Sequence, residues 1–565
     1  YDKKTNLLLA KLTTGENVSL RTFYQYDQNA QLICTIEDDG VDRDERDLTG
    51  VSHRSIQRVK RRQDAFLSGM PDFITTAYLD MDRQVEVPLK STQLHYDLHG
   101  NIVKEEVCDA KGVCQYENRL QYDKKNRPIR KANALYTEFI SYDANNRICN
   151  IEALDSKKAE RFTYNPEGHL VLKEDISDGE EIRATKIRYD ALGRILSQEN
   201  HLGKVDEYKY DKKGHIITTT SKNPSLEGGY TKDKKVQHFD CLGRMIKETS
   251  TIGGREITYN IDGKPVYIKY PDGTKEHFTY DLRGLLQTHV NQRNTTRIYT
   301  YDCPGRKTAE RVYSPSQKLL DQRTWRYNAL HLVEESLSDG TSVYYTYNFA
   351  GQLVEKTRLN QPERYTYDTL GRLSSIVYRK DQVTFRKRFE YDLLDRVIEK
   401  RIEEDSPRRR VLFRESYSYD MQNHLVKKTQ FIQNRPATKL WEYDAFSRPL
   451  SCIDEEGHLT SYSYKVKEVA KGVFVDEERI EGPSGDVTIQ WRDANSHLVK
   501  TEKIANGKTL EEDRYAYDAS GNLIFHEETL FFPGLSPKKA SKRYTYDSMQ
   551  RIASISEFAD SVKER

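Results

Sequence analysis

One short phrase recurs along this chain and decides what the chain can fold into. It reads Tyr-Asp-x-x-Gly-Arg followed by an aliphatic residue, as in residues 189–195. We count 21 such units, and the closest neighbours are 20 or 21 residues apart. A unit this short cannot bury a hydrophobic core alone and must pack against its neighbours, so the sequence predicts a repeat protein. The units begin at Tyr1, Tyr26, Tyr96, Tyr122, Tyr142, Tyr164, Tyr189, Tyr210, Phe239, Tyr259, Tyr280, Tyr301, Tyr327, Tyr347, Tyr367, Tyr391, Tyr419, Tyr443, Arg492, Tyr517 and Tyr546.

Each unit is interpreted as a β-hairpin. Bulky and polar residues alternate before the Tyr-Asp pair, as in Tyr208-Lys209-Tyr210, and a period of two is typical of a half-buried strand. Asp favours a turn through a bond from its side chain to the backbone, and Gly supplies a positive φ. A second strand then starts two residues after the Gly, and a looser turn such as Pro271-Asp272-Gly273-Thr274 closes the unit. The prediction is an all-β fold of repeated antiparallel hairpins.

The turn residues are the candidate site, and we expect their role to be structural. Where Gly is missing, Asn126, Asn146 and Asn423 take its place, because Asn tolerates the left-handed region next best. A histidine stands at the Arg position in His169, His215, His424 and His497, and we interpret these as polar residues at strand edges rather than metal ligands. The predicted structural residues are Tyr189, Asp190, Gly193, Arg194, Tyr280, Asp281, Gly284, Tyr301, Asp302, Gly305, Tyr367, Asp368, Gly371, Arg372, Tyr517, Asp518 and Gly521.

Composition predicts a folded chain with little dry core. Only 36% of residues are apolar, 32% are charged and the mean hydropathy is −0.84. The 38 tyrosines nevertheless argue against disorder, which is usually poor in aromatic residues. A sheet that is wetted on both faces, with ladders of stacked Tyr and aliphatic side chains, fits these numbers better than a packed sandwich. Length alone suggests three or four domains, but the repetition favours one continuous sheet.

The recurring Tyr-Asp-x-x-Gly-Arg-Leu phrase resembles the YD repeat of the Rhs family. That family includes the shell-forming subunits of bacterial toxin complexes and the teneurin YD shell. The match covers nearly the whole chain outside about residues 38–90. The resemblance implies a hairpin ribbon coiled into a hollow shell, a β-cocoon, in which a toxin or other cargo domain of the same parent chain is held until delivery.

Size makes such a shell physically reasonable. Two strands per unit give roughly 42 strands, and at about 4.8 Å per strand the ribbon is on the order of 200 Å long. Wound about one and a half to two times, it has room for one small domain, whose radius of gyration is about 13 Å. The sequence lacks the Asp-Pro signature at which Rhs toxins are cut, and both of its ends fall inside repeats. We therefore expect a piece of a larger chain.

One region breaks the period. We divide the chain into repeats at 1–37, a non-repeat insertion at 38–92 and the main array at 93–565. Ser52 is expected to cap a short helix that carries Ile56 and Val59 on one face. The basic residues that follow are interpreted as a solvated surface, with a contact to nucleic acid or to an acidic partner as the alternative.

Catalytic and ligand signals are weak. The sequence Gly507-Lys508-Thr509 lacks the earlier Gly of a phosphate loop, and His526 lacks a second His at zinc-helix spacing. We predict no enzyme, cofactor or metal. The 90 basic and 88 acidic residues leave a net charge of +2, so no nucleic-acid partner is expected. No apolar run reaches the 18 or so residues of a membrane span.

Seven cysteines are too scattered for a disulfide framework. Only Cys108 and Cys114 could face each other across a hairpin, and we expect the others to be small buried hydrophobic residues. This usage fits bacterial synthesis and export, with the protein secreted or at the cell surface. Whether Cys108 and Cys114 are bridged stays open at this point.

Two functional classes remain. The first is a non-enzymatic scaffold that encapsulates a cargo or toxin domain outside this sequence. The second is a surface adhesion or recognition protein whose rows of Tyr and Arg stack on glycans or bind a receptor. Secretion machinery is a further expected partner of the first class. An enzyme comes third.

Overall fold

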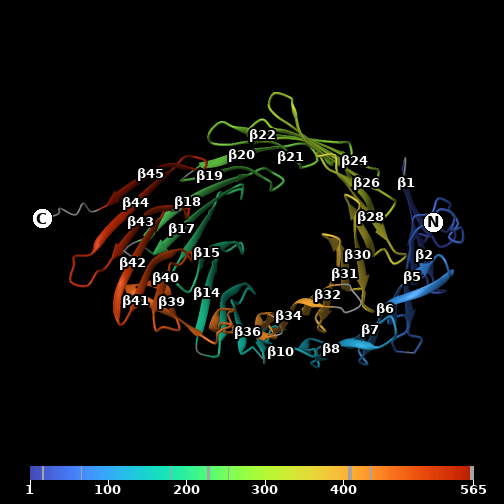
Figure 1. The fold of residues 1–565 in the computed structure, drawn as a ribbon, viewed down its shortest axis with the longest axis horizontal. Helices are drawn as coiled ribbons and strands as arrows, with labels where there is room; N and C mark the ends of the chain where they lie inside the picture. The colour runs from blue at the N-terminus through green and yellow to red at the C-terminus, as the bar shows by residue number, and fades with distance from the viewer. Residues whose placement is uncertain are drawn as a thin grey trace. The chain divides into compact units, whose positions relative to one another are not determined.

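The computed structural model describes residues 1–15, 18–64, 66–154, 156–179, 181–224, 230–251, 253–404, 410–432, 435–518 and 520–559. These residues form 45 β-strands and no helix (Figure 1). The predicted all-β fold of repeated antiparallel hairpins is confirmed. Within the described ranges no helix exists that is long and apolar enough to span a bilayer.

The strands up to residue 280 are β1 (Ala10–Gly15), β2 (Val18–Tyr26), β3 (Leu32–Asp38), β4 (Arg54–Arg61), β5 (Pro71–Asp80), β6 (Val85–Tyr96), β7 (Ile102–Asp109), β8 (Cys114–Tyr122), β9 (Pro128–Ala132), β10 (Thr137–Tyr142), β11 (Ile148–Ala153), β12 (Lys158–Tyr164), β13 (Leu170–Ser177), β14 (Glu181–Tyr189), β15 (Ile195–Glu199), β16 (Val205–Tyr210), β17 (Ile216–Pro224), β18 (Tyr230–Phe239), β19 (Met245–Ser250), β20 (Gly253–Tyr259), β21 (Pro265–Lys269) and β22 (Lys275–Tyr280).

The later strands are β23 (Leu286–Val290), β24 (Thr296–Tyr301), β25 (Lys307–Tyr313), β26 (Leu319–Tyr327), β27 (Leu332–Ser336), β28 (Ser342–Tyr347), β29 (Leu353–Arg358), β30 (Gln361–Tyr367), β31 (Leu373–Lys380), β32 (Val383–Tyr391), β33 (Val397–Glu404), β34 (Val411–Tyr419), β35 (Leu425–Ile432), β36 (Arg435–Tyr443), β37 (Pro449–Ile453), β38 (Leu459–Ala470), β39 (Val473–Glu481), β40 (Val487–Arg492), β41 (Leu498–Ala505), β42 (Lys508–Tyr517), β43 (Leu523–Leu530), β44 (Lys538–Tyr546) and β45 (Ile552–Ala559).

The chain divides into two compact units, and each unit contains an early and a late segment. Unit 1 holds Tyr1–Ile140 together with Tyr280–Met421 and Lys428–Ala437. Unit 2 holds Ser141–Thr279 together with Gln422–Lys427 and Thr438–Arg565. Each unit therefore brings together stretches of the array that are far apart in the sequence.

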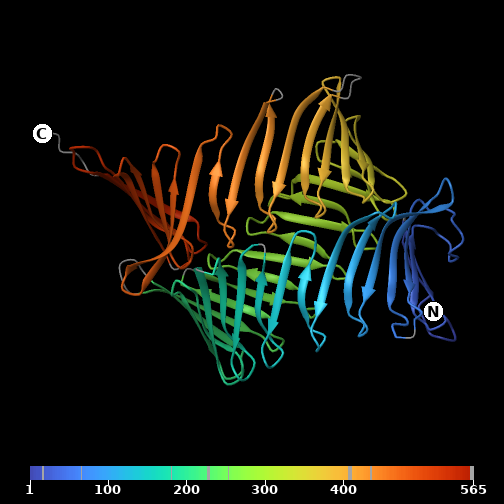
Figure 2. The same ribbon diagram turned by 90° about the horizontal axis from the view of Figure 1, so that it is seen from below.

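Within each unit, strands that follow one another in the chain pair antiparallel, and Figure 2 shows them side by side in chain order. The hairpin register is interrupted at the repeat tyrosine. Tyr301 lies opposite Lys307 and Tyr367 opposite Leu373, with a one-residue shift just before each tyrosine. Such a β-bulge bends the strand and increases its twist. The bulge recurs along the array because the Tyr-Asp turn recurs.

Few of the described side chains are fully shielded from water. Some of the buried apolar residues form a small cluster in unit 1, centred on Phe23, Ile36 and Ile56, and a second in unit 2, centred on Val475 and Trp491, while others are scattered along the array. Most other strand residues are half-buried. Since a fully buried apolar core is this small, hydrogen bonds and stacking between repeats must supply much of the cohesion.

The region from 38 to 92 differs from the expectation. The predicted helix after Ser52 is absent, because Ile56 and Val59 belong to strand β4, which pairs with β3 and β5. The alternation of this strand was hidden in the sequence, since its inward-facing positions are Arg54 and Ile56 and a buried arginine looks polar. The boundaries at 37/38 and 92/93 stay a prediction.

Candidate functional site

Each Tyr-Asp turn is closed by its aspartate. Asp190 Oδ1 accepts the backbone N–H groups of Leu192 and Arg194, both at 2.9 Å, while Oδ2 accepts Arg194 Nε at 2.8 Å. These bonds favour the charged carboxylate, with the backbone N–H of Arg194 contributing most, and they lower the pKa of Asp190. The same acceptor role falls to Asp281, Asp302, Asp368 and Asp518.

The residue four positions after the tyrosine has left-handed backbone. The φ of Gly193 is 77°, and that of Gly284, Gly305, Gly371 and Gly521 is 79°, 93°, 81° and 88°. At the substituted positions φ is 60° for Asn126, 66° for Asn146 and 71° for Asn423. Gly and, next, Asn adopt this region at low cost, so the turn geometry favours them, although Asp395, Ser447 and Ser496 adopt it at the same position with φ of 62°, 66° and 65°.

The tyrosine of each repeat is hydrogen-bonded to the repeat before it. Tyr189 donates its hydroxyl to the Leu170 carbonyl at 2.9 Å. The hydroxyls of Tyr301, Tyr367 and Tyr517 bond in the same way to the carbonyls of Leu286, Leu353 and Leu498 at 2.7, 2.9 and 2.9 Å. Burial raises the pKa of Tyr280, Tyr301, Tyr367 and Tyr517. These hydroxyls therefore remain protonated donors at neutral pH.

The arginine of each repeat stacks on the tyrosine of the next. Arg194 lies 4.3 Å from the ring centre of Tyr210, Arg306 lies 4.4 Å from that of Tyr327, and Arg372 lies 4.9 Å from that of Tyr391. The sequence pattern contains both partners but does not pair them across repeats. We name the combined Tyr-Asp-Arg arrangement the repeat ladder. Its Asp fixes the Arg, and the Arg covers the next ring.

Histidines at the arginine position keep the ladder continuous. His169 stacks on Tyr189 with ring centres 4.8 Å apart, and His497 stacks on Tyr517 at 4.6 Å. His331 and His424 stack likewise on Tyr347 and Tyr443. The replacement of Arg by His at this position was visible in the sequence. The structure explains it, because a planar imidazole can cover the tyrosine ring as a planar guanidinium does.

The late segment of each unit contacts the early segment along what we call the seam. In unit 1, the Cys303 thiol faces the Thr14 carbonyl at 3.5 Å, and Thr369 Oγ1 donates to Asp109 Oδ2 at 3.1 Å. The partners are 289 and 260 residues apart in sequence. In both cases a Tyr-Asp turn of the late segment contacts an early hairpin at its other end, where the second turn of the repeat closes the unit. We call this second turn a return turn.

Unit 2 has a seam of the same construction. Asn200 Nδ2 donates to the Ala494 carbonyl at 2.9 Å across a separation of 294 residues. Arg448 Nη1 reaches Glu181 Oε1 at 3.2 Å while its Nε stays bonded to Asp444 of its own turn at 2.6 Å. A groove of 1040 Å³ lies along this seam, lined by residues of both segments. The seam is therefore polar and partly open.

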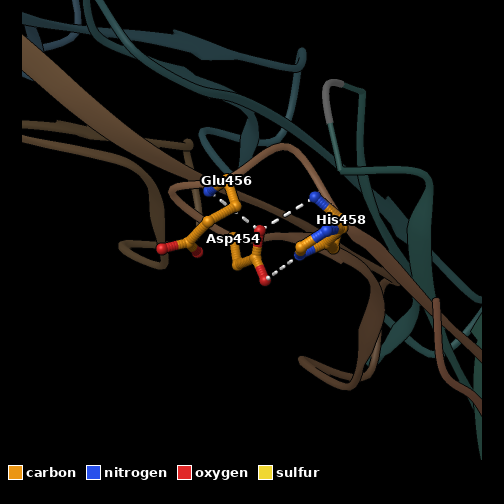
Figure 3. Close-up of side chains that lie close together, drawn as sticks. All are labelled: Asp454, Glu456 and His458. Atoms are coloured by element: carbon orange, nitrogen blue, oxygen red, sulfur yellow. Dashed lines mark hydrogen bonds and ion pairs between the residues drawn. The ribbon is translucent and has the colours of Figure 1, made fainter.

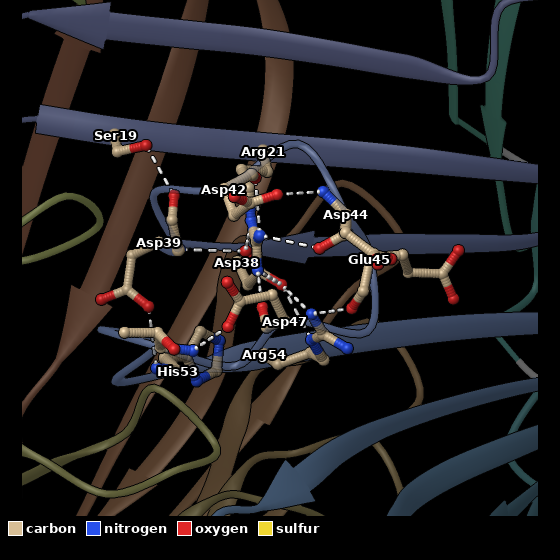
Figure 4. Close-up of polar contacts among 12 residues, drawn as sticks. Ser19, Arg21, Asp38, Asp39, Asp42, Asp44, Glu45, Asp47, His53 and Arg54 are labelled. Carbon is tan, nitrogen blue, oxygen red and sulfur yellow. Dashed lines mark hydrogen bonds and ion pairs between the residues drawn. The ribbon is translucent and has the colours of Figure 1, made fainter.

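A loop near the N-terminus places His53 at the unit 1 seam (Figure 4). Arg21 is fully buried and donates to Asp38 at 2.6 Å, and Arg54 donates to the other oxygen of the same carboxylate at 2.8 Å. Arg21 also donates to the carbonyls of Asp42, Asp44 and Asp47 at 2.7, 3.1 and 2.9 Å. A buried charge needs such pairing, and these bonds tie the backbone of the acidic loop to Arg21.

From this loop His53 reaches the late segment. Its Nδ1 lies within hydrogen-bond distance of the Phe349 carbonyl, and its ring meets His331 edge-on, with centroids 5.6 Å apart. Burial, with a further contribution from His53, lowers the pKa of His331. The basic residues after Ser52 are also engaged: Arg58 pairs with Glu86 and Arg62 with Asp64.

One cluster has metal-ligand chemistry. Ligand atoms of Asp454, Glu456 and His458 lie within 4.8 Å of one another (Figure 3). Asp454 accepts the backbone N–H groups of Glu456 and His458 at 3.0 and 2.8 Å, and its other oxygen lies 3.1 Å from His458 Nδ1. This is the ordinary bonding of an aspartate turn, and the cluster is largely exposed. His526 instead pairs with Asp513 and stacks on Tyr515.

Comparison with known proteins gives partial relatives. No family model matches the chain. It is 27% identical over 189 residues to double-stranded DNA deaminase toxin A of Burkholderia cenocepacia (strain H111), covering 33% of this chain and 12% of the relative. It is 23% identical over 250 residues to Teneurin-3 of Danio rerio and 24% over 233 residues to Teneurin-3 of Mus musculus, covering 42% and 37% of this chain and 8% of each relative.

Solved structures extend the likeness to the whole chain. A chain in the crystal structure of TcdB2-TccC3-Cdc42 matches with a TM-score of 0.57 and 13% identity, covering all of this chain and 34% of that one. A chain of TcdB2-TccC3 without the hypervariable C-terminal region matches with a TM-score of 0.51, 95% of this chain and 35% of that one being covered. At this identity the match shows the fold, and it confirms the predicted fold class. This chain spans a minor part of every one of these proteins.

Proposed function

We propose that this chain, which belongs to the Rhs/YD-repeat family, is a non-enzymatic scaffold that forms part of the wall around a cargo or toxin domain of its parent protein. A wall made from a ribbon needs cohesion along the ribbon and closure between neighbouring passes. The repeat ladder supports the first requirement, and the seam supports the second. The family resemblance adds the cargo, which lies outside this sequence.

The seam is the observation that carries the proposal. In both units the segments that meet are 260 to 296 residues apart, and a late Tyr-Asp turn meets an early return turn, except at His53, which lies on a loop. A ribbon with no reason to close would leave both of its edges in water. Turn-to-turn contacts with side chains such as Arg448 indicate a sheet shaped to lie against itself.

Secretion, or display at the cell surface, belongs to the same proposal. A protein that delivers a cargo must leave the cell that makes it, and secretion machinery is then a further partner. The half-buried, tyrosine-rich strands present no obvious chemistry for nucleic acid, and the arginines of the 54–62 region are engaged within the protein.

The alternative, a surface adhesion protein, loses its main support. It rested on rows of Tyr and Arg free to stack on glycans. In the ladder the Tyr210 hydroxyl bonds to the Ile195 carbonyl at 2.9 Å and its ring is covered by Arg194. A tyrosine whose hydroxyl is already bonded and whose ring is already covered has little free surface for a sugar to stack on. Binding of the intact protein to a glycan array would revive this alternative.

Protection of a fused reporter tests the scaffold. The chain is produced with a folded reporter of about 100 residues joined to it, a size chosen for one small domain, and the complex is treated with a broad protease. We expect the reporter to survive in the intact protein and to be cut when Asn200 and Arg448 are both replaced by Ala. Arg326→Ala is the control, because Arg326 is 68% exposed and pairs with Glu334 of the adjacent strand. Equal cleavage of the fused and the free reporter would disprove encapsulation.

A further inference from the structure

Two thiols stand opposite each other beside the unit 1 seam. Cys108 is the residue before Asp109, which ends β7, and Cys114 begins β8; the two cysteines are register partners in this antiparallel hairpin. Among the strand pairs of the described residues, no other two cysteines are partners in this way. Both are free thiols, Cys114 exposed and Cys108 half-buried.

The hairpin places the two cysteines opposite each other, just after a one-residue register shift between Val107 and Cys108. Directly opposed residues of an antiparallel pair have Cα atoms about 4.5 to 5.5 Å apart, and disulfides join Cα atoms about 4.4 to 6.8 Å apart. The turn between them is closed by two backbone bonds, from Asp109 N to Val113 O at 3.0 Å and from Gly112 N to Asp109 O at 2.9 Å. Approach of the sulfurs is therefore already organised before any bond forms.

The turn between the thiols is also the docking point for the late segment. Asp109 Oδ2 accepts Thr369 Oγ1 at 3.1 Å and Gln115 Nε2 at 3.0 Å. The Ala110 N–H points to the Thr369 carbonyl at 3.4 Å. Restricting this turn would restrict the surface that Thr369 meets.

We propose that Cys108 and Cys114 form a redox modification site that closes by exchange with a small disulfide such as oxidised glutathione and fastens the return turn under Thr369. The Cys114 thiolate attacks one sulfur of the small disulfide, forming a mixed disulfide and releasing one small thiol. The Cys108 thiolate then attacks the Cys114 sulfur and releases the second small thiol. The two protein thiols are oxidised by two electrons, the small disulfide is reduced, and the two protons end on the released thiols.

The exposure and the pKa of the thiols determine which one reacts first and how the rate of closure depends on pH. Cys114 is reached first because it is exposed. Burial, with a further contribution from the neighbouring Cys108 sulfur, raises the pKa of the Cys114 thiol. Since the thiolate is the attacking form, closure is expected to be faster at mildly alkaline than at neutral pH. The inference concerns a local bond and does not depend on encapsulation.

Peptide mapping tests the bond. The intact protein is equilibrated with reduced and oxidised glutathione, the remaining thiols are alkylated, and trypsin cuts after Lys111, which lies between the two cysteines. We expect the peptides 105–111 and 112–119 to be recovered joined, two hydrogens lighter than their sum. In Cys108→Ser the mixed disulfide should instead persist on Cys114. Recovery of wild-type Cys114 as the glutathione adduct with Cys108 alkylated would overturn the proposal.

Hydrogen exchange tests the fastening. Oxidation is expected to slow exchange of the Ala110 and Gly112 amides by roughly tenfold, because a cross-link removes open conformations of the turn. The double variant Cys108→Ser with Cys114→Ser should show no response to the same treatment. A bridged protein whose turn amides exchange as fast as in the reduced form would refute the structural role while leaving the bond established.

Discussion

The early and late Tyr-Asp turns occupy the same position in the repeat and meet different surroundings. At the turn tips, the residues directly after the aspartate in the early segment of unit 2, Ala191 and Cys241, are exposed. The corresponding late tips include Ala445 and Ala494, which are 6% and 8% exposed. Early tips also carry charges, as in Lys212-Lys213, whereas the late tips at the unit 2 seam carry none. The repeat fixes the turn, and the neighbour across the seam decides what its tip can be.

A charge placed at a tip should separate the two kinds of turn most strongly. Ala494→Lys puts an ammonium group where the Asn200 contact closes the seam, and burying a charge without a partner is expected to cost about 3 kcal/mol. Ala191→Lys, at the same repeat position, places the same group in water and should cost no more than about 0.5 kcal/mol. The measurement is the free energy of local opening, from amide exchange in β15 and β40. Equal costs for the two variants would show that the tips do not differ.

The arginine position gives the next largest contrast. Arg448 serves its own turn, the ring of Tyr464 and Glu181 across the seam, so Arg448→Ala should destabilise unit 2 by about 3 kcal/mol. Arg194 contacts Asp190 of its own turn and the Tyr210 ring, and Arg194→Ala should cost about 1 kcal/mol. If both variants lose the same free energy in exchange measurements, the Glu181 contact contributes nothing.

Removing the tyrosine hydroxyl should cost the same free energy in the early and the late segment. Tyr210→Phe in the early segment and Tyr517→Phe in the late segment each remove one hydroxyl that is bonded to a carbonyl of the preceding repeat. We expect a loss of about 1 kcal/mol in each case. A loss confined to one segment would mean that the ladder is not uniform along the chain.

The smallest effect is one of pH. Because burial lowers the pKa of His331 from its ordinary 6.5, the unfolded histidine binds its proton before the folded one does. Stability contributed at this site is therefore complete above about pH 6.5 and falls as the pH drops below it. The groups that face His331 are His53, Asp39 and Arg306. The free energy of local opening at the unit 1 seam, obtained from exchange rates corrected for the intrinsic pH dependence of amide exchange, should fall from pH 7.5 to 5.5, and His331→Gln should remove that fall. His169→Gln, at an early turn, is the matched control and should leave it unchanged.

Local chemistry explains what the sequence could reveal. Alternation before the Tyr-Asp pair, the aspartate turn and the left-handed Gly or Asn are all set by residues within one hairpin, and these were predictable. The helix after Ser52 was a wrong prediction, because the strand there buries Arg54 against Asp38 and so lacks an apolar alternation.

The seam could not be predicted from the sequence, for a different reason. Which turns meet depends on how much each strand bends and twists, summed over some 280 residues, and no local pattern encodes that sum. The pairing of each arginine with the next tyrosine was likewise hidden, although the planar histidines at the arginine position pointed to stacking.

The bond from each tyrosine hydroxyl to the repeat before it has a mechanical consequence. Each of these bonds joins nearest neighbours only, so the part of the stability that lies along the ribbon accumulates as a one-dimensional sum. Once the seam contacts have opened, a force applied to one end of such a ribbon loads a single hairpin at a time, and the hairpins come off one after another. The work needed to strip it then grows with the number of repeats removed, while the hairpins further along keep their structure.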